Sequence, residues 1–126
     1  MSLLHGLLGN ASEKEVGSVE KDLAMIISDG ESVQKAYKLI RDLIILTNKR
    51  LIYVDVQGIT GKKREYHSIP YTKITQFSVE TAGHLDLDAE LKIWVAGMSA
   101  PREIQFSRSA NLTDLVKVLS YHVLNA

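Results

Sequence analysis

The spacing of apolar residues changes twice along this chain of 126 residues. Up to residue 27 apolar positions recur every three or four residues, as they do on one face of an α-helix. Residues 31–107 instead carry short runs of β-branched and aromatic residues between polar turns, which is typical of β-strands. Helical spacing returns over residues 111–125. The pattern predicts a helical N-terminal segment, a set of strands and a closing helix.

The N-terminal segment carries two helical patterns. The first is an apolar stripe formed by Leu3, Leu4, Leu7 and Leu8. The second begins at Ser12, which forms a capping box with Glu15, and it ends at the turn residues 28–30. We therefore expect residues 1–30 to form a helical arm and residues 31–126 to form the domain proper.

Seven runs in the central part have strand character. They cover residues 33–40, 42–47, 50–56, 64–69, 74–81, 89–96 and 102–107. Most connections between them are too short for the crossovers that parallel strands require, so the strands are expected to be antiparallel. Residues 47–50 are predicted to form a hairpin turn, and Pro70 is predicted to end a strand because it lacks a backbone N–H.

The final helix has recognisable start signals. Asn111 is a suitable cap, and Asp114 would then lie in the first turn, where the helix dipole favours a negative charge. One apolar stripe follows, formed by Leu112, Leu115, Val116, Leu119 and Val123.

Composition narrows the classes of partner. Lysine plus arginine and aspartate plus glutamate both number 15, so the formal net charge is +0 and no strong field attracts nucleic acid or an anionic membrane. Without cysteine the chain can form neither a disulfide nor a thiolate metal site. The N-terminus lacks the positively charged start of a signal peptide. We expect a cytoplasmic protein that binds no nucleic acid, and contact with a membrane is not expected.

Four segments together resemble the bacterial pleckstrin-homology (PH) family. They are GLLGNASE (6–13), KLIRDLIILTNKRLIYVDVQGITGKK (38–63), SIPYTKI (68–74) and FSVETAGHLDLDAELKIWVAG (77–97). The resemblance implies a mainly β fold, in which a bent seven-stranded antiparallel sheet, or partly open barrel, is capped by the C-terminal helix. It also implies homo-oligomeric rings, and it implies no established activity.

Residues 57–66, QGITGKKREY, contain glycines and a lysine in the order of a phosphate-binding loop. Such a loop needs four residues between its glycines, whereas only two separate Gly58 from Gly61, and Lys62 is followed by a second lysine. It must also lead into a helix, and a strand is expected here. The glycines are therefore predicted to supply positive φ angles in a β-turn.

The densest basic run, Lys62, Lys63 and Arg64, has two interpretations. It is a candidate contact for an anion or a lipid headgroup, or it is a solvated hairpin end whose charges discourage pairing between sheet edges. Eukaryotic PH domains that bind phosphoinositides gather basic residues in their first loop. The chain departs from that pattern, because its only basic residue there, Arg41, is followed by Asp42.

Other polar residues form no recognised catalytic or metal-binding constellation. His84, Asp86, Asp88 and Glu90 alternate along one stretch, but on an extended strand they stand too far apart to hold one cation, and only a curled loop could bring them together. Asp55 and Glu80 are candidates for buried carboxylates or for ordinary strand ends. The four histidines fall in separate elements. We therefore expect no enzyme activity, no metal and no cofactor.

The function expected from the sequence is that of a non-enzymatic scaffold or interaction module that works as a cyclic homo-oligomer. Its candidate interface is the stripe Leu3, Leu4, Leu7 and Leu8, because so short a helical segment needs another surface to pack against. The alternative is a peripheral module that binds anionic lipid or phosphate through Lys62, Lys63 and Arg64.

Overall fold

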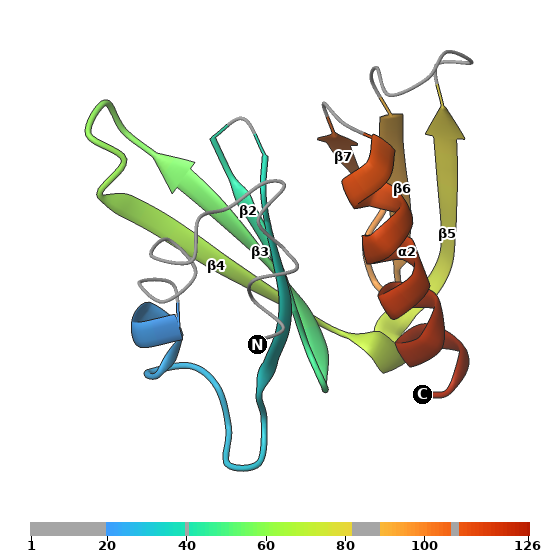
Figure 1. Ribbon diagram of the computed structural model, residues 1–126, viewed down its shortest axis with the longest axis horizontal. Helices are drawn as coiled ribbons and strands as arrows, with labels where there is room; N and C mark the ends of the chain where they lie inside the picture. The colour runs from blue at the N-terminus through green and yellow to red at the C-terminus, as the bar shows by residue number, and fades with distance from the viewer. Residues whose placement is uncertain (1–19, 40, 82–88, 107–108) are drawn as a thin grey trace. The chain divides into compact units, whose positions relative to one another are not determined.

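The computed structural model of the chain describes residues 20–39, 41–81, 89–106 and 109–126. These residues divide between two compact units, Met1–Ser68 and Ile69–Ala126. A helical turn at residues 20–23 precedes the strands shown in Figure 1. The elements are β1 (Val33–Lys38), β2 (Leu43–Thr47), β3 (Arg50–Gln57), β4 (Lys63–Pro70), the 3₁₀ helix η2 (Tyr71–Lys73), β5 (Ile74–Thr81), β6 (Ala89–Val95), β7 (Arg102–Phe106) and α2 (Ser109–Leu124).

The first unit is built on a four-stranded sheet with the order β1-β2-β3-β4. Strand β2 pairs antiparallel with β1 and with β3, and all five of its side chains are buried. A strand buried on both faces requires a continuous apolar run, and the sequence LIIL supplies it. The core of this unit is therefore centred on β2.

Two turns of this sheet match the sequence prediction. Residues 47–50 connect β2 to β3, with the Thr47 hydroxyl accepting hydrogen bonds from the backbone N–H groups of Lys49 and Arg50 at 3.0 and 2.9 Å. In the β3–β4 turn, Gly58 and Gly61 have φ angles of 80° and 69°. The glycines thus belong to a turn between strands, as predicted, and the turn leads into β4 rather than into a helix.

The second sheet has the order β5-β6-β7. Strand β4 ends at Pro70, which has no N–H to donate, and η2 separates β4 from β5. The predicted seven antiparallel strands are therefore hydrogen-bonded as two sheets. In β6 the side chains of Ala89, Leu91 and Ile93 are buried and those between them are half-buried, so the strand turns one face to the core.

Helix α2 closes the second unit by packing against β6, β7 and η2. Its buried side chains are Leu112, Leu115 and Leu119, members of the predicted apolar stripe. The predicted start was wrong by two residues: the helix begins at Ser109, so Asn111 lies inside it and the first turn contains no acidic residue. Ser109 is itself compatible with a helix start, so the apolar stripe alone does not define the boundary.

Candidate functional site

The β1–β2 and β3–β4 connections lie at the same end of the four-stranded sheet, the upper end in Figure 1. In an antiparallel meander alternate connections share an end, while the β2–β3 turn lies at the other. A hydrogen bond joins the two connections: Nη2 of Arg41 donates to the carbonyl oxygen of Gly58 at 2.6 Å. We call this region, formed by residue 41 and residues 58–63, the loop end.

Asp42 fixes the base of the loop end. Its Oδ2 accepts a hydrogen bond from the Tyr53 hydroxyl at 2.7 Å, and its Oδ1 accepts one from the backbone N–H of Val56 at 3.0 Å. The carboxylate is therefore directed to neutral donors on β3. Asp42 was noted in the sequence only as a charge that opposes Arg41, and its role in bracing β3 depends on contacts that the sequence alone does not reveal.

The three basic residues predicted as an anion contact do not share one environment. Arg64 lies 3.8 Å from the carboxylate of Asp22 and is partly neutralised by it. Lys62 and Lys63 are exposed, and neither forms an ion pair with any residue that the structure describes. Within the described part of the chain, the cations of the predicted site without an ion pair are therefore Lys62 and Lys63, and the structure adds Arg41 to them.

Ile59 is the feature of the loop end that sequence reasoning missed. Its side chain is fully exposed, with a relative accessibility of 105%. The available signal was an isoleucine placed between two turn glycines, where no strand face can bury it. The loop end thus combines an exposed apolar side chain with exposed cations.

The opposite end of the same sheet holds a buried carboxylate, Glu31. Its oxygens accept hydrogen bonds from Nε and Nη2 of Arg50 at 2.8 and 2.6 Å and from the Thr47 hydroxyl at 2.6 Å. Ser28 adds bonds from its backbone N–H and its hydroxyl. The Arg50 guanidinium is the main cause that holds the pKa of Glu31 far below its usual value.

In this cluster the oxygens of Glu31 already accept hydrogen bonds from Arg50, Thr47 and Ser28, which argues for a structural role. Arg50 also donates to the Ser68 hydroxyl and to the Ile26 carbonyl, both at 3.1 Å, so it joins the segment before β1 to β4. The buried carboxylate is not one of the two candidates from the sequence. Glu80 is exposed, and Asp55 is half-buried beside Gln57, whose amide donates to it at 3.0 Å.

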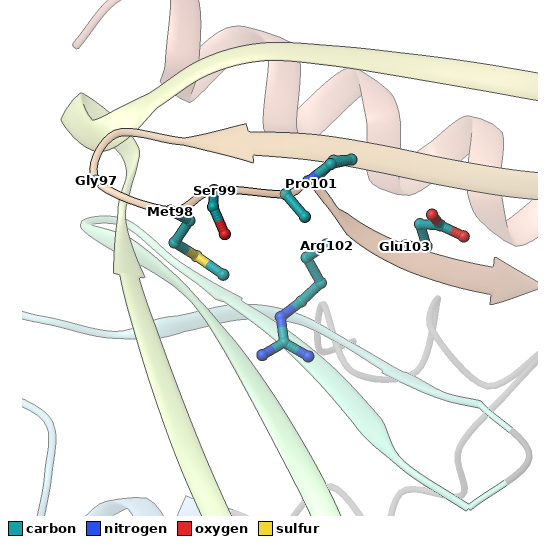
Figure 2. A pocket seen from close by; sticks show the side chains of 7 residues that line it. Gly97, Met98, Ser99, Pro101, Arg102 and Glu103 are labelled. Atoms are coloured by element: carbon teal, nitrogen blue, oxygen red, sulfur yellow. The ribbon is translucent and has the colours of Figure 1, made fainter.

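A shallow concavity of about 620 Å³ lies along the β6–β7 turn (Figure 2). It is lined by Gly97, Met98, Ser99, Ala100, Pro101, Arg102 and Glu103. All seven residues come from one continuous segment, so polar groups from separate elements do not converge there. The concavity lacks the convergent lining that a small-molecule site requires.

Two sets of residues from the sequence analysis fall largely outside the described residues. The structure does not describe the leucine stripe formed by Leu3, Leu4, Leu7 and Leu8. It also does not describe most of the acidic stretch at residues 84–90. Its described member Glu90 lies 4.0 Å from the amino group of Lys92. The described residues contain no group of three potential metal ligands, and none of their helices is long and apolar enough to cross a membrane.

Comparison with known families identifies the class of protein. The sequence matches the bacterial PH domain family over residues 2–123, which is nearly the full length of this chain. Seven antiparallel strands capped by a C-terminal helix agree with the resemblance, although the strands form two sheets where one bent sheet was expected. The chain therefore belongs to the bacterial PH domain family, and its fold is PH-like.

Individual relatives agree with this assignment. The chain is 54% identical to the uncharacterized protein YjqA of Bacillus subtilis, covering 95% of this chain and 97% of YjqA. A pleckstrin-homology domain from Shewanella amazonensis superposes with a TM-score of 0.76 at 45% identity, covering 97% of this chain and 98% of that domain. A protein with such a domain from Shewanella loihica gives a TM-score of 0.77 at 42% identity, covering 90% and 97%.

Proposed function

We propose that this protein is a non-enzymatic scaffold whose working form is a homo-oligomer assembled through the edge of β5. The observation that carries the proposal is the composition of this strand. Its outer edge pairs with no described strand, and five side chains along it are exposed, namely Thr75, Gln76, Ser78, Val79 and Glu80. An edge of this kind presents unpaired N–H and C=O groups to another chain.

The other strands at sheet edges carry more of the features that prevent such pairing. Strand β1 has Lys35 and Lys38, and β7 has Arg102 and Glu103. Strand β4 begins with three charged residues and ends in proline. Strand β5 has one charged residue, Glu80, and a register shift confined to its first three residues, so its middle is open to association.

Side-chain burial along β5 supports the same interface. Val79 lies opposite Leu91 and Phe77 opposite Ile93, so both belong to the apolar face of the sheet. Leu91 and Ile93 are fully buried, whereas Phe77 is half-buried and Val79 is 43% exposed. A second copy paired along β5 would cover this partly exposed apolar surface and add buried area to the backbone hydrogen bonds.

Light scattering of the purified full chain tests this interface. Pairing of the β5 edge with the same edge of a second copy closes a dimer, so we expect a mass of about twice 14.0 kDa. Gln76→Lys places a charge on the open edge and should reduce this mass. The matched control is Gln105→Lys on β7, where the new lysine faces Glu90 and the mass should not change. A monodisperse monomer at tens of micromolar would refute the oligomer.

The sequence offers a different interface, the leucine stripe. An oligomer that resists Gln76→Lys but dissociates when Leu3, Leu4, Leu7 and Leu8 become serine would assign self-association to the N-terminal segment and refute the role of β5. Dissociation of the oligomer in Gln76→Lys, but not in the variant with the four serines, would support β5 as the interface.

A further inference from the structure

We propose that the loop end of the four-stranded sheet is a contact site for the surface of an anionic lipid bilayer. The inference goes beyond the scaffold proposal and does not depend on it, since it uses residues of the first unit only. Ile59 would enter the boundary between headgroups and acyl chains, and Arg41, Lys62 and Lys63 would lie among the anionic headgroups.

The first step is the exposure of Ile59. A fully exposed isoleucine leaves its whole apolar surface in water, and no side chain of the turn shields it. Its position is fixed by the glycines on either side, because the positive φ angles of Gly58 and Gly61 hold the turn in a shape that other residues rarely adopt. The apolar side chain is therefore presented on a defined turn.

The second step is the sign of the charge around Ile59. The turn and its flanks, residues 57–64, contain three basic residues and no acidic one. Asp22 pairs with Arg64, the second residue of β4, and no carboxylate among the described residues forms an ion pair with Lys62 or Lys63. An apolar tip beside exposed cations is complementary to an anionic bilayer, which offers apolar chains below a negative surface.

The third step is the position of Arg41. Its guanidinium donates to the Gly58 carbonyl, a neutral partner, so the bond fixes the side chain beside the tip without removing its charge. The neighbouring carboxylate of Asp42 is directed to Tyr53 and Val56. The β1–β2 connection thereby adds Arg41 to Lys62 and Lys63 as a third exposed cation, one that the basic run at residues 62–64 does not contain.

The same geometry argues against a pocket for a soluble phosphate. Arg41 binds the carbonyl just before the exposed Ile59, and Lys62 and Lys63 follow it in the chain, so these cations lie next to an apolar side chain. The concavity described above lies elsewhere, at residues 97–103. Because the net charge of the chain is +0, attraction is local and should weaken steeply with salt. Contact with a membrane therefore becomes the preferred use of this surface, in contrast to the expectation from composition.

Co-sedimentation of the full chain with vesicles of mixed phosphatidylcholine and phosphatidylglycerol provides the affinity test. We expect binding at low salt, and no binding to phosphatidylcholine alone. Ile59→Ser should weaken the partition constant about tenfold, and Lys62→Ala with Lys63→Ala should weaken it about fivefold for each charge removed. Met25→Ser and Lys49→Ala are matched controls, because both residues are exposed but lie outside the loop end.

A fluorescent label gives a second, site-specific readout. The chain has no cysteine, so Ile59→Cys can carry a single environment-sensitive dye, and Met25→Cys serves as its control. We expect a blue shift with anionic vesicles at position 59 only. The proposal is overturned if the vesicles are not bound at low salt, if both positions respond equally, or if soluble glycerol phosphate displaces the protein, which would indicate a phosphate site instead.

Discussion

Nη2 of Arg50 lies 2.6 Å from Oε1 of Glu31, and the side chain of Glu31 has no exposed surface. The two residues are separated by 19 positions in the sequence. Together they join the segment before β1 to the β2–β3 turn, since Thr47 also donates to Glu31. This contact lies at the end of the four-stranded sheet opposite the loop end, where it links the two segments.

Arg50→Met should destabilise the protein strongly. It removes the charged partner of a buried carboxylate, and such a loss costs about 2–4 kcal/mol of the free energy of unfolding. Urea denaturation monitored by circular dichroism measures the change. Arg64→Met is the control: its pair with Asp22 is exposed and should contribute less than about 1 kcal/mol. Equal effects of the two substitutions would contradict a special role for Glu31.

The pair of Glu31 and Arg50 should make the stability of the fold depend on pH. The folded-state pKa of Glu31 lies well below its ordinary value of 4.5, mainly because Arg50 hydrogen-bonds to the ionised form. The ionised carboxylate therefore stabilises the fold fully above pH 4.5, and this contribution is lost as the pH falls through the range below it. The stability difference between the native protein and Glu31→Gln should be constant near neutral pH and shrink in acid. A difference that grows in acid would refute this assignment.

The two turn glycines should differ in their tolerance of alanine. Both have positive φ angles, and an L-residue there costs about 1–2 kcal/mol. An added Cβ at Gly61 would also lie 3.3 Å from Cγ1 of Val56, whereas at Gly58 it would meet nothing within 4 Å. Gly61→Ala should therefore lower the free energy of unfolding more than Gly58→Ala.

Chemical denaturation of the two alanine variants gives the comparison. Val56→Ala removes the atom that the new Cβ would approach, so it should be less harmful in the Gly61→Ala background than in the native protein. Purely additive effects would show that the close approach does not matter.

His122, near the end of α2, should destabilise the fold when it is protonated. Its ring stacks on Tyr71 at a centroid distance of 4.5 Å and an interplanar angle of 8°. Burial lowers the pKa of His122 below its ordinary 6.5, so the unfolded chain binds the proton more readily and stability falls as the pH drops below 6.5. His122→Phe keeps an aromatic ring on Tyr71 and should reduce this loss. Thermal unfolding of the native protein and of His122→Phe, at pH values above and below 6.5, measures how the stability of each depends on pH. The same pH dependence in both proteins would contradict the prediction.

Much of the architecture follows from local patterns in the sequence. All seven strands lie within three residues of their predicted bounds at either end, and Pro70 ends β4 as expected. These elements could be predicted because side-chain alternation and turn residues act over a few positions. The glycine turn at residues 58–61 could be predicted for the same reason.

The candidate site could be predicted only in part. Lys62 and Lys63 stand out as a basic run, but the exposure of Ile59 and the position of Arg41 depend on how two connections meet at one end of a sheet. Likewise, composition does not distinguish Arg64, which pairs with Asp22, from the two lysines beside it.

The sequence by itself determined the number and order of the seven strands, the closing helix and the membership of the PH-like class, because these depend on periodicity and on a pattern spread over most of the chain. The tertiary structure alone decided which charges are neutralised, as for Glu31 by Arg50, and which apolar side chain is left in water, as for Ile59. The physical reason is that solvation and pairing depend on residues brought together from distant positions, whose distances no local pattern contains.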